Sequence, residues 1–246
     1  MLQENSAVMD RRKYVVIMAG GSGTRMGASV PKQFLELKGK AVLRRTIEVF
    51  MEACPEINVV TVLPDEHIRY WKDYCYKENF ICPQVLVKGG ITRFHSVRNA
   101  LEKVPDGALV AIHDGVRPLL SPQLVADLFS KAVSSPGVIP VIPCVDTMKM
   151  LQKKVWEDGS ETYLPLPGQA VDRSLLYCVQ TPQVFHSEEI KAAYRLPYET
   201  SFTDDASVFE KYGKSLSYMA GERLNIKITT REDLEFAEAI LNLRED

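Results

Sequence analysis

Short runs of consecutive apolar residues alternate with longer helical segments along the first half of the chain. The apolar runs predict strands over Tyr14–Ala19, Ile57–Leu63, Val85–Lys88, Ala108–His113 and Gly137–Ile142. The segments between them predict helices over Ala41–Ala53, Glu66–Tyr76, Arg93–Val104 and Pro122–Val133. The strand runs are apolar throughout, as expected when helices cover both faces of a sheet. We therefore expect an α/β fold with a mostly parallel sheet flanked by helices.

The alternation stops after Ile142. A long polar segment over about 146–173 follows, with prolines and short apolar pieces that suit a hairpin. Because a structureless loop of this length is uncommon in a compact domain, we expect a protruding β-arm that packs on another subunit. A mobile surface insertion is the alternative. Trp156, Tyr163 and Leu164 favour the arm, since such side chains seldom lie in solvent without a partner.

The C-terminal part of the chain again shows signals of regular structure. We expect a helix with Ser187 as its N-cap, a second helix over 204–212, and a strand over Leu224–Ile228. Thr229 and Glu232 have the spacing of a capping box, which predicts the start of a final amphipathic helix.

Composition and charge are those of an ordinary globular protein. The chain has 246 residues, of which 46% are hydrophobic and 25% are charged, and its formal net charge is −2. Without a basic surplus we expect no nucleic-acid partner, and without a long apolar run we expect no membrane span. Residues 1–13 form a polar extension without a secretory signal, so we expect a cytoplasmic protein with a single domain over 14–246.

A glycine-rich run after the first predicted strand carries the clearest chemical signal. It consists of Ala19, Gly20, Gly21, Ser22 and Gly23, and it is followed by the cations Arg25 and Lys32. Glycines let several backbone N–H groups approach one anion, and the cations add charge, so the run predicts a nucleotide-phosphate site. Its spacing fits neither a P-loop nor a dinucleotide-binding turn. An ordinary glycine-rich surface loop is the alternative.

Further polar residues lie where the predicted strands end, which is the edge at which parallel sheets bind ligands. The carboxylate of Asp114 can reach a ribose, a metal or phosphates there; an Asx-type turn is the alternative. Gly90 permits close approach of a base or sugar, and Ser96 can hydrogen-bond to it. A plain strand-to-helix connection explains these two residues equally well.

Two cations and two hydroxyl groups are candidates for a second phosphate site. Arg173 can hold a phosphate by bidentate contact and Lys227 as a point charge, while Thr147 and Thr181 can donate hydrogen bonds. Each of them alone is more often a solvated surface residue, so the prediction depends on their combination.

Taken in order along the chain, the motifs resemble the 2-C-methyl-D-erythritol 4-phosphate cytidylyltransferase family of the non-mevalonate isoprenoid pathway. The resemblance extends from Tyr14 to about Leu241. It is carried by Ala19–Gly27, Pro31–Gln33, Gly89–Ser96, His113–Pro118, Asp146–Lys149, Val171–Arg173, Thr181–Gln183, Thr203–Ala206 and Asn225–Lys227.

The resemblance implies a Rossmann-like, nucleotide-diphospho-sugar transferase-like fold and a specific reaction. CMP passes from CTP to 2-C-methyl-D-erythritol 4-phosphate, giving 4-CDP-2-C-methyl-D-erythritol and pyrophosphate. The implied cofactor is Mg²⁺, held mainly by the CTP phosphates and water, with Asp114 as the candidate protein ligand. The implied assembly is a homodimer formed through the arm, in which Arg173 serves the neighbouring active site.

The resemblance also implies a role for each site residue. The catalytic residues are Arg25, Lys32, Arg173 and Lys227. The nucleotide-binding residues are Ala19, Gly20, Gly21, Ser22, Gly23, Gly90, Ser96 and Asp114. The acceptor-binding residues are Arg117, Thr147, Arg173, Thr181, Thr203 and Lys227.

Three other functions compete with this interpretation. The loop after the first strand also resembles that of ribitol-5-phosphate cytidylyltransferases, although the motifs at 146–149 and 171–173 fit the methylerythritol enzymes better. An NAD-dependent oxidoreductase is disfavoured because Gly27 comes one residue late. A catalytically silent nucleotide sensor is disfavoured because the four cations are all retained. Ile91 and Thr92 replace acidic residues common in the family, so the base contacts are less specified.

Overall fold

The fold is built on a central sheet with the first strand near its middle. The computed structural model describes residues 11–21, 30–166, 168 and 171–245. Within these ranges the sheet has eight strands. β1 (Lys13–Met18) pairs in parallel with β6 (Leu109–Asp114) on one side and β4 (Asn58–Leu63) on the other. β5 (Gln84–Lys88) pairs in parallel with β4 and ends this half of the sheet.

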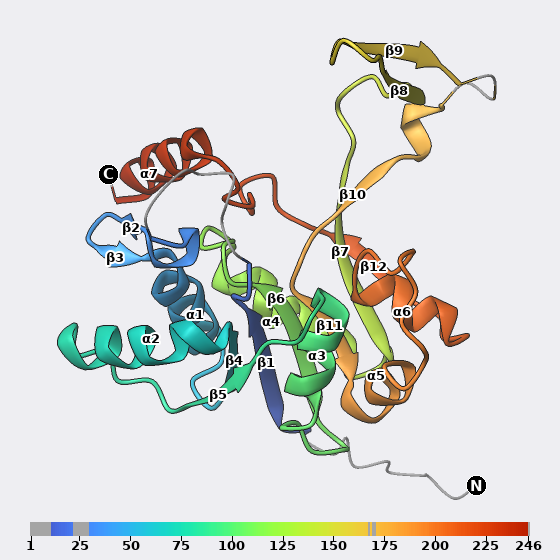
Figure 1. Cartoon of the computed structure of the whole chain (residues 1–246). Helices are drawn as coiled ribbons and strands as arrows, with labels where there is room; N and C mark the ends of the chain where they lie inside the picture. Colours follow the sequence, from blue (N-terminus) through green and yellow to red (C-terminus); the bar gives the residue numbers. More distant parts are fainter. Residues whose placement is uncertain (1–10, 22–29, 167, 169–170, 246) are drawn as a thin grey trace, which may run out of the picture.

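The other half of the sheet is mixed. β11 (Gln183–His186) lies between β6 and β7 (Gly137–Pro143) and runs antiparallel to both. β10 (Tyr177–Val179) pairs antiparallel with the end of β7, and β12 (Ser217–Ala220) pairs with β7 in parallel. The predicted fold class is confirmed: most strands are parallel, and helices flank the sheet (Figure 1).

Successive side chains of a strand point to opposite faces of the sheet, so both faces are apolar and both are covered by helices. One face packs on α1 (Val42–Ala53), α2 (Asp65–Lys77) and α4 (Pro122–Ala132). The other packs on α3 (Arg93–Leu101), α5 (Ser187–Ala193) and α6 (Asp205–Lys211). Within β1, Val15 and Ile17 enter the first core and Val16 enters the second.

A third, smaller core lies over the C-terminal ends of the parallel strands. It joins α7 (Arg231–Glu245) to Leu37 and Ile228. Leu37 belongs to a small ribbon formed by β2 (Glu36–Leu37) and β3 (Lys40–Ala41), which follows the short helix η2 (Lys32–Phe34). No helix in the described part of the chain is long and apolar enough to cross a membrane.

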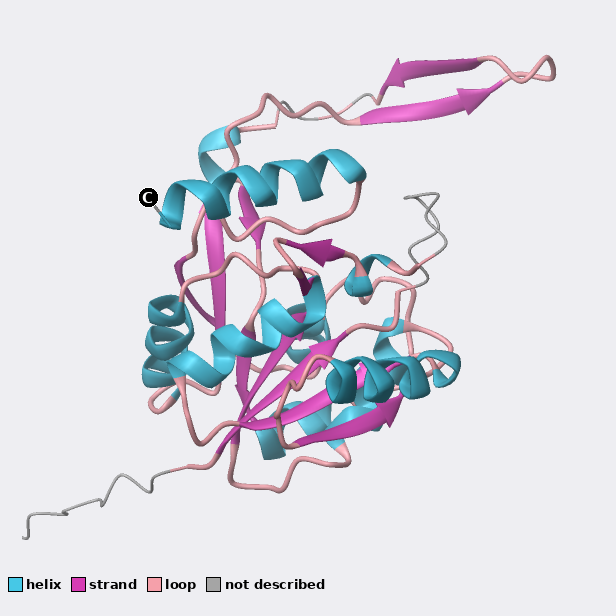
Figure 2. Ribbon diagram, turned by 90° about the vertical axis from the view of Figure 1, so that its left-hand side faces the viewer, coloured by secondary structure: helices cyan, strands magenta, loops and turns pink. Residues whose placement is uncertain are grey.

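The predicted arm is an antiparallel hairpin that projects from the sheet (Figures 1 and 2). It consists of β8 (Leu151–Val155) and β9 (Glu161–Pro165), and every residue of both strands is exposed. Its large apolar side chains are therefore in solvent in the single chain; Tyr163, for example, is 59% exposed.

Three local predictions were wrong. Ser187 is the first residue of α5 rather than its cap, because its hydroxyl accepts a hydrogen bond from the Ala108 N–H. Residues 224–228, all of them described, form an irregular segment and not a strand. The cap of α7 lies one residue later than expected: Asp233 accepts from the N–H groups of Thr229 and Thr230, whereas Glu232 was predicted to form the box.

Candidate active site

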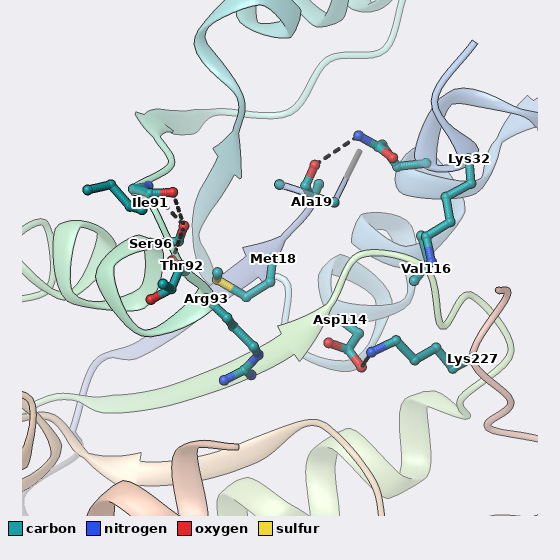
Figure 3. A pocket seen from close by; sticks show the side chains of 14 residues that line it. Met18, Ala19, Lys32, Ile91, Thr92, Arg93, Ser96, Asp114, Val116 and Lys227 are labelled. Carbon is teal, nitrogen blue, oxygen red and sulfur yellow. Dashed lines mark hydrogen bonds and ion pairs between the residues drawn. The ribbon is translucent and has the colours of Figure 1, made fainter. Parts of the chain in front are cut away.

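Two adjoining hollows open at the carboxyl ends of β1 and β6. The first, the glycine half, is lined by residues that include Gly20, Gly21, Lys32, Gly90 and Ser96. The second, the threonine half, is lined by residues that include Arg117, Thr181 and Thr203. Both halves share Arg93, Asp114 and Lys227, and we call the two together the trench. Figure 3 shows Lys32 and Lys227 pointing into the same hollow.

The glycine half is anchored to the end of β1. The buried Gln33 side chain donates to the Ala19 carbonyl oxygen at 2.9 Å, which fixes η2 and places Lys32 beside the strand end. Gly20 and Gly21 follow at the exposed rim. Ser22, Gly23 and Arg25 lie outside the described residues.

The loop before α3 forms the opposite wall of the glycine half. The Ser96 hydroxyl accepts from the Gly90 N–H at 2.9 Å and donates to the Thr92 carbonyl oxygen at 2.9 Å. Any Cβ at Gly90 would lie 2.5 Å from the Cβ of His95, so this tight loop requires glycine. Ser96 therefore holds the conformation of the loop through these two hydrogen bonds. The Ile91 side chain projects into solvent and is 96% exposed.

Asp114 lies at the junction of the two halves, with cations around it. Its carboxylate is 3.0 Å from Lys227 Nζ and 3.1 Å from Arg117 Nε. Burial acts to raise the pKa of Asp114, but Lys227, Arg93 and Arg117 outweigh it and hold that pKa well below the ordinary aspartate value. The group is therefore a carboxylate at neutral pH, and it holds both neighbouring cations toward the trench.

A strap over residues 221–228 carries Lys227 to the trench. The Gln180 side chain makes two hydrogen bonds to the first residues of this strap: it donates to the Glu222 carbonyl oxygen at 2.7 Å and accepts from the Glu222 N–H at 3.1 Å. The Glu222 carboxylate in turn accepts from the Ser121 N–H at 2.9 Å. Further along, Arg117 donates to the Asn225 carbonyl oxygen at 2.9 Å. These side-chain contacts, with the hydrogen bond from the Ile228 N–H to the Val116 carbonyl oxygen, hold the segment in place of the strand pairing predicted here.

One close ion pair in the wall of the trench was not predicted from the sequence. Arg93, the first residue of α3, donates to both carboxylate oxygens of Asp205 at 2.8 and 2.6 Å. Asp205 is fully buried, and the Tyr194 hydroxyl donates to it as well. The pair joins the loop before α3 to the start of α6, over a separation of 112 residues along the chain.

Two predicted site residues are not found among the described residues that line the trench. Thr147 lies at the base of the arm, and Arg173 begins the short helix η3 (Arg173–Leu175) where the chain returns from it. The Arg173 guanidinium donates to the Val145 carbonyl oxygen at 3.0 Å. Within one chain, the arm thus separates Thr147 and Arg173 from the other acceptor-binding candidates.

The fold and the site together define the class of protein. A mostly parallel α/β sheet carries a glycine-lined, cation-rich trench at its carboxyl edge, the arrangement expected of a nucleotidyltransferase. The family model for 2-C-methyl-D-erythritol 4-phosphate cytidylyltransferase (IspD) matches residues 14–243. The chain belongs to this family, and the resemblance seen in the sequence is confirmed.

Relatives and solved structures agree with this assignment. The chain is 44% identical over 229 residues to the 2-C-methyl-D-erythritol 4-phosphate cytidylyltransferase of Phocaeicola vulgatus, covering 93% of this chain and 99% of the relative. It is also 44% identical to the 2-C-methyl-D-erythritol 4-phosphate cytidylyltransferase of Porphyromonas gingivalis W83, and this match covers 95% of this chain and 99% of the relative. The 4-diphosphocytidyl-2C-methyl-D-erythritol synthase of Anaerococcus prevotii superposes with a TM-score of 0.75 at 30% identity, covering 94% of this chain and 99% of that one.

Family membership decides among the competing functions. The chain is an enzyme, a nucleotidyltransferase, so the oxidoreductase and silent-sensor alternatives are set aside. The ribitol alternative is set aside as well, because the matching family is defined by methylerythritol phosphate.

Proposed function

We propose that the trench is where this chain transfers CMP from CTP to 2-C-methyl-D-erythritol 4-phosphate. The activity is that of the family, and its products are 4-CDP-2-C-methyl-D-erythritol and pyrophosphate. One observation carries the assignment of substrates: the glycine half and the threonine half share Asp114 and Lys227. Two anions bound in the two halves would therefore meet beside a cation.

CTP fits the glycine half. Gly20 and Gly21 are exposed at the end of β1 and line this half, and glycine lets phosphates approach backbone N–H groups closely. The constrained loop at Gly90, with Ser96 beneath it, forms a wall that suits the cytosine ring. Lys32 lines the same hollow, where it would stabilise charge on the α-phosphate together with Arg25.

The acceptor phosphate fits the threonine half. Lys227 and Arg117 supply positive charge there, and Thr203 supplies a hydroxyl at the rim. Because Asp114 neutralises part of this charge and orients both cations, they are preorganised rather than mobile. Lys227 then stands where the acceptor phosphate and the α-phosphate approach each other.

The chemistry needs alignment and charge more than a protein base. An oxygen of the acceptor phosphate forms a bond to the α-phosphorus of CTP, and the bond from that phosphorus to the bridging oxygen breaks, releasing pyrophosphate. A phosphate monoester is already ionised at neutral pH, so no proton must be removed. Each pair of unit charges repels by about 4 kcal/mol at about 4 Å and an effective dielectric constant near 20. Lys32, Arg25 and Lys227 offset this repulsion.

Mg²⁺ is the proposed cofactor, and the described residues fit a metal held chiefly by substrate. They contain no group of three or more His, Cys, Asp or Glu side chains that would hold an ion by themselves. Asp114 is the carboxylate at the junction of the two halves. A single carboxylate combined with substrate phosphates and water suits Mg²⁺, which when bound neutralises charge on the triphosphate and the leaving group.

The arm supports a proposed homodimer. It exposes a cluster of large apolar side chains, and at its base Thr147 and Arg173 lie apart from the trench of their own chain. If the arm packs on a second copy, burial of these side chains stabilises the pair and brings Thr147 and Arg173 to the partner subunit's acceptor site.

A steady-state assay with both candidate acceptors tests the proposed function. We expect pyrophosphate release from CTP with methylerythritol phosphate and little with ribitol 5-phosphate. Lys227→Ala is expected to lower kcat/KM for the acceptor about a hundredfold. The matched control is Lys131→Ala, which removes an exposed lysine of α4. Preferential turnover of ribitol 5-phosphate, or equal effects of the two lysine variants, would contradict the proposal.

A further inference from the structure

His113 is a fully buried polar residue at the end of β6, directly before Asp114. Both of its ring nitrogens have partners. Nε2 lies 3.2 Å from the Arg117 carbonyl oxygen, and Nδ1 lies 3.0 Å from the Thr181 hydroxyl oxygen. The ring also packs edge-on against Phe50, at 5.0 Å between centroids. These contacts leave the imidazole little freedom to turn.

The partners determine the tautomer of His113. A carbonyl oxygen only accepts hydrogen bonds, so Nε2 must carry a hydrogen and donate it to Arg117. The Thr181 hydroxyl oxygen already accepts from the Asp114 N–H, and among the described residues Nδ1 is the acceptor that the hydroxyl hydrogen reaches, so Nδ1 has no hydrogen of its own. Nδ1 therefore accepts, and the Thr181 hydroxyl donates to it.

The same hydroxyl connects His113 to the main chain of the trench. Thr181 Oγ1 accepts from the Asp114 N–H at 3.1 Å while its hydrogen points to His113. The Thr181 carbonyl oxygen accepts from the Asn225 side chain at 2.8 Å. One buried chain of hydrogen bonds thus links the Asp114–Arg117 turn, the segment before β11, and the strap that carries Lys227.

We propose that His113 is a positioning residue for the acceptor side of this enzyme. Its two hydrogen bonds fix the Thr181 hydroxyl and the turn that carries Asp114 and Arg117, so the threonine half is formed before substrate binds. This inference rests on the proposed assignment of the acceptor to that half. It also gives Thr181 a structural task, because the hydrogen of its hydroxyl is directed into the protein.

The tautomer can be measured without any substitution that affects folding. The chain has four histidines, so a long-range proton–nitrogen NMR spectrum at neutral pH resolves each ring. We expect His113 as the neutral ring protonated at Nε2, with Nδ1 accepting a hydrogen bond. A hydrogen on Nδ1 would overturn the proposal by itself.

Two variants of His113 separate its two hydrogen bonds in kinetic assays. In His113→Gln the amide nitrogen replaces Nε2 and the acceptor for Thr181 is lost, whereas in His113→Asn the amide oxygen replaces Nδ1. We expect His113→Gln to raise KM for methylerythritol phosphate about tenfold with KM for CTP within about twofold, and His113→Asn to have a smaller effect. His186→Gln is the matched control, since His186 contacts the Ala132 carbonyl oxygen at the opposite end of the sheet.

A double variant shows whether His113 acts through Thr181. Combined with Thr181→Val, His113→Gln should raise the acceptor KM no further than Thr181→Val alone, because both remove the same link. Additive effects, equal rises in both KM values, or a loss confined to kcat would overturn the proposal. Absence of wild-type turnover would instead refute the proposed function and leave the NMR result standing, so the two failures are distinguishable.

Discussion

The charged residues at the carboxyl edge of the sheet are held by one another before any substrate is present. Asp114 fixes Lys227 and Arg117, and Asp205 fixes Arg93. These carboxylates reduce the net positive charge of the trench, so its cations do not form an unbalanced cluster. Lys32 is supplied separately, by η2, on the nucleotide side.

Lys32→Ala tests whether Lys32 is the cation that acts on the nucleotide. We expect kcat to fall about a hundredfold or more with the fold intact, because the lost charge acts on the α-phosphate in the transition state. Arg25→Ala is expected to behave in the same way. Steady-state kinetics with Lys131→Ala as the control measures the effect, and near-normal turnover in both site variants would refute the role.

His113 also predicts how stability depends on pH. Its pKa is lowered to about 3 in the folded protein, whereas an unfolded histidine titrates near 6.5. Between these values the unfolded chain binds a proton that the folded chain excludes, so the free energy of unfolding falls as pH is lowered. The slope well below pH 6.5 is about 1.4 kcal/mol per pH unit.

Urea unfolding of wild type and His113→Gln from about pH 7 to about pH 5 measures this contribution. The wild type should be the more stable at neutral pH, and its advantage in unfolding free energy should narrow on acidification, because only the wild type has a histidine here that takes up a proton on unfolding. If the free energies of unfolding of the two proteins change equally with pH, His113 can be protonated in the folded protein, and the prediction is wrong.

Local sequence patterns predicted individual residues of the trench but missed the long-range contacts that hold it together. Gly90, Ser96, Asp114 and Lys227 follow strands or occupy motifs, and all four line the trench. The contacts of His113 with Thr181 and of Arg93 with Asp205 join residues 68 and 112 positions apart. No spacing rule connects such positions, so only the folded chain reveals them.

At the level of elements, local patterns located most helices and the strands β1, β4, β5, β6 and β7 within a few residues, whereas β12 was not predicted. The helix expected from Pro122 begins at that residue as α4, and the Ser121 hydroxyl caps it by accepting from the Leu124 N–H at 3.0 Å. The predicted strand over 224–228 failed because tertiary contacts override local preference. Its carbonyl and N–H groups pair with Arg117 and with the Val116 carbonyl oxygen rather than with a neighbouring strand.

The start of α7 gives a test at this scale. Asp233 accepts from the N–H groups of Thr229 and Thr230 and from the Thr229 hydroxyl, so it carries the cap. Asp233→Ala should lower the free energy of unfolding by about 1 kcal/mol, as loss of an N-terminal cap typically does. Glu232→Ala is the matched control, and thermal unfolding of both compares them. An equal or larger loss in Glu232→Ala would restore the capping box predicted from the sequence.

At the level of the whole molecule, the arm is the feature that a single chain does not explain. Its strands are exposed, and the predicted residues at its base lie away from the trench. The sequence indicated a hairpin from its apolar pieces, but its direction depends on packing that local patterns do not encode. A second copy of the chain that packs on the arm would bury its exposed strands and bring the residues at its base to a site.

Subunit mixing tests the proposed dimer. In a dimer of a Lys32→Ala chain with an Arg173→Ala chain, shared sites would leave one site with both residues intact. Random exchange should then restore about a quarter of wild-type activity, since half of the dimers are mixed and half of their sites are intact. Pyrophosphate release after verified exchange is the readout, with each variant alone as the control. Failure to recover activity would mean that each site is built within one chain.

The central claim is that the trench brings two anions together so that the acceptor phosphate displaces pyrophosphate from CTP. The most direct measurement uses methylerythritol phosphate with heavy oxygen in its phosphate group, followed by mass spectrometry of both products. The account predicts that all of the label stays in 4-CDP-2-C-methyl-D-erythritol and that the pyrophosphate is unlabelled. Label in the pyrophosphate, or no turnover of these two substrates, would contradict it.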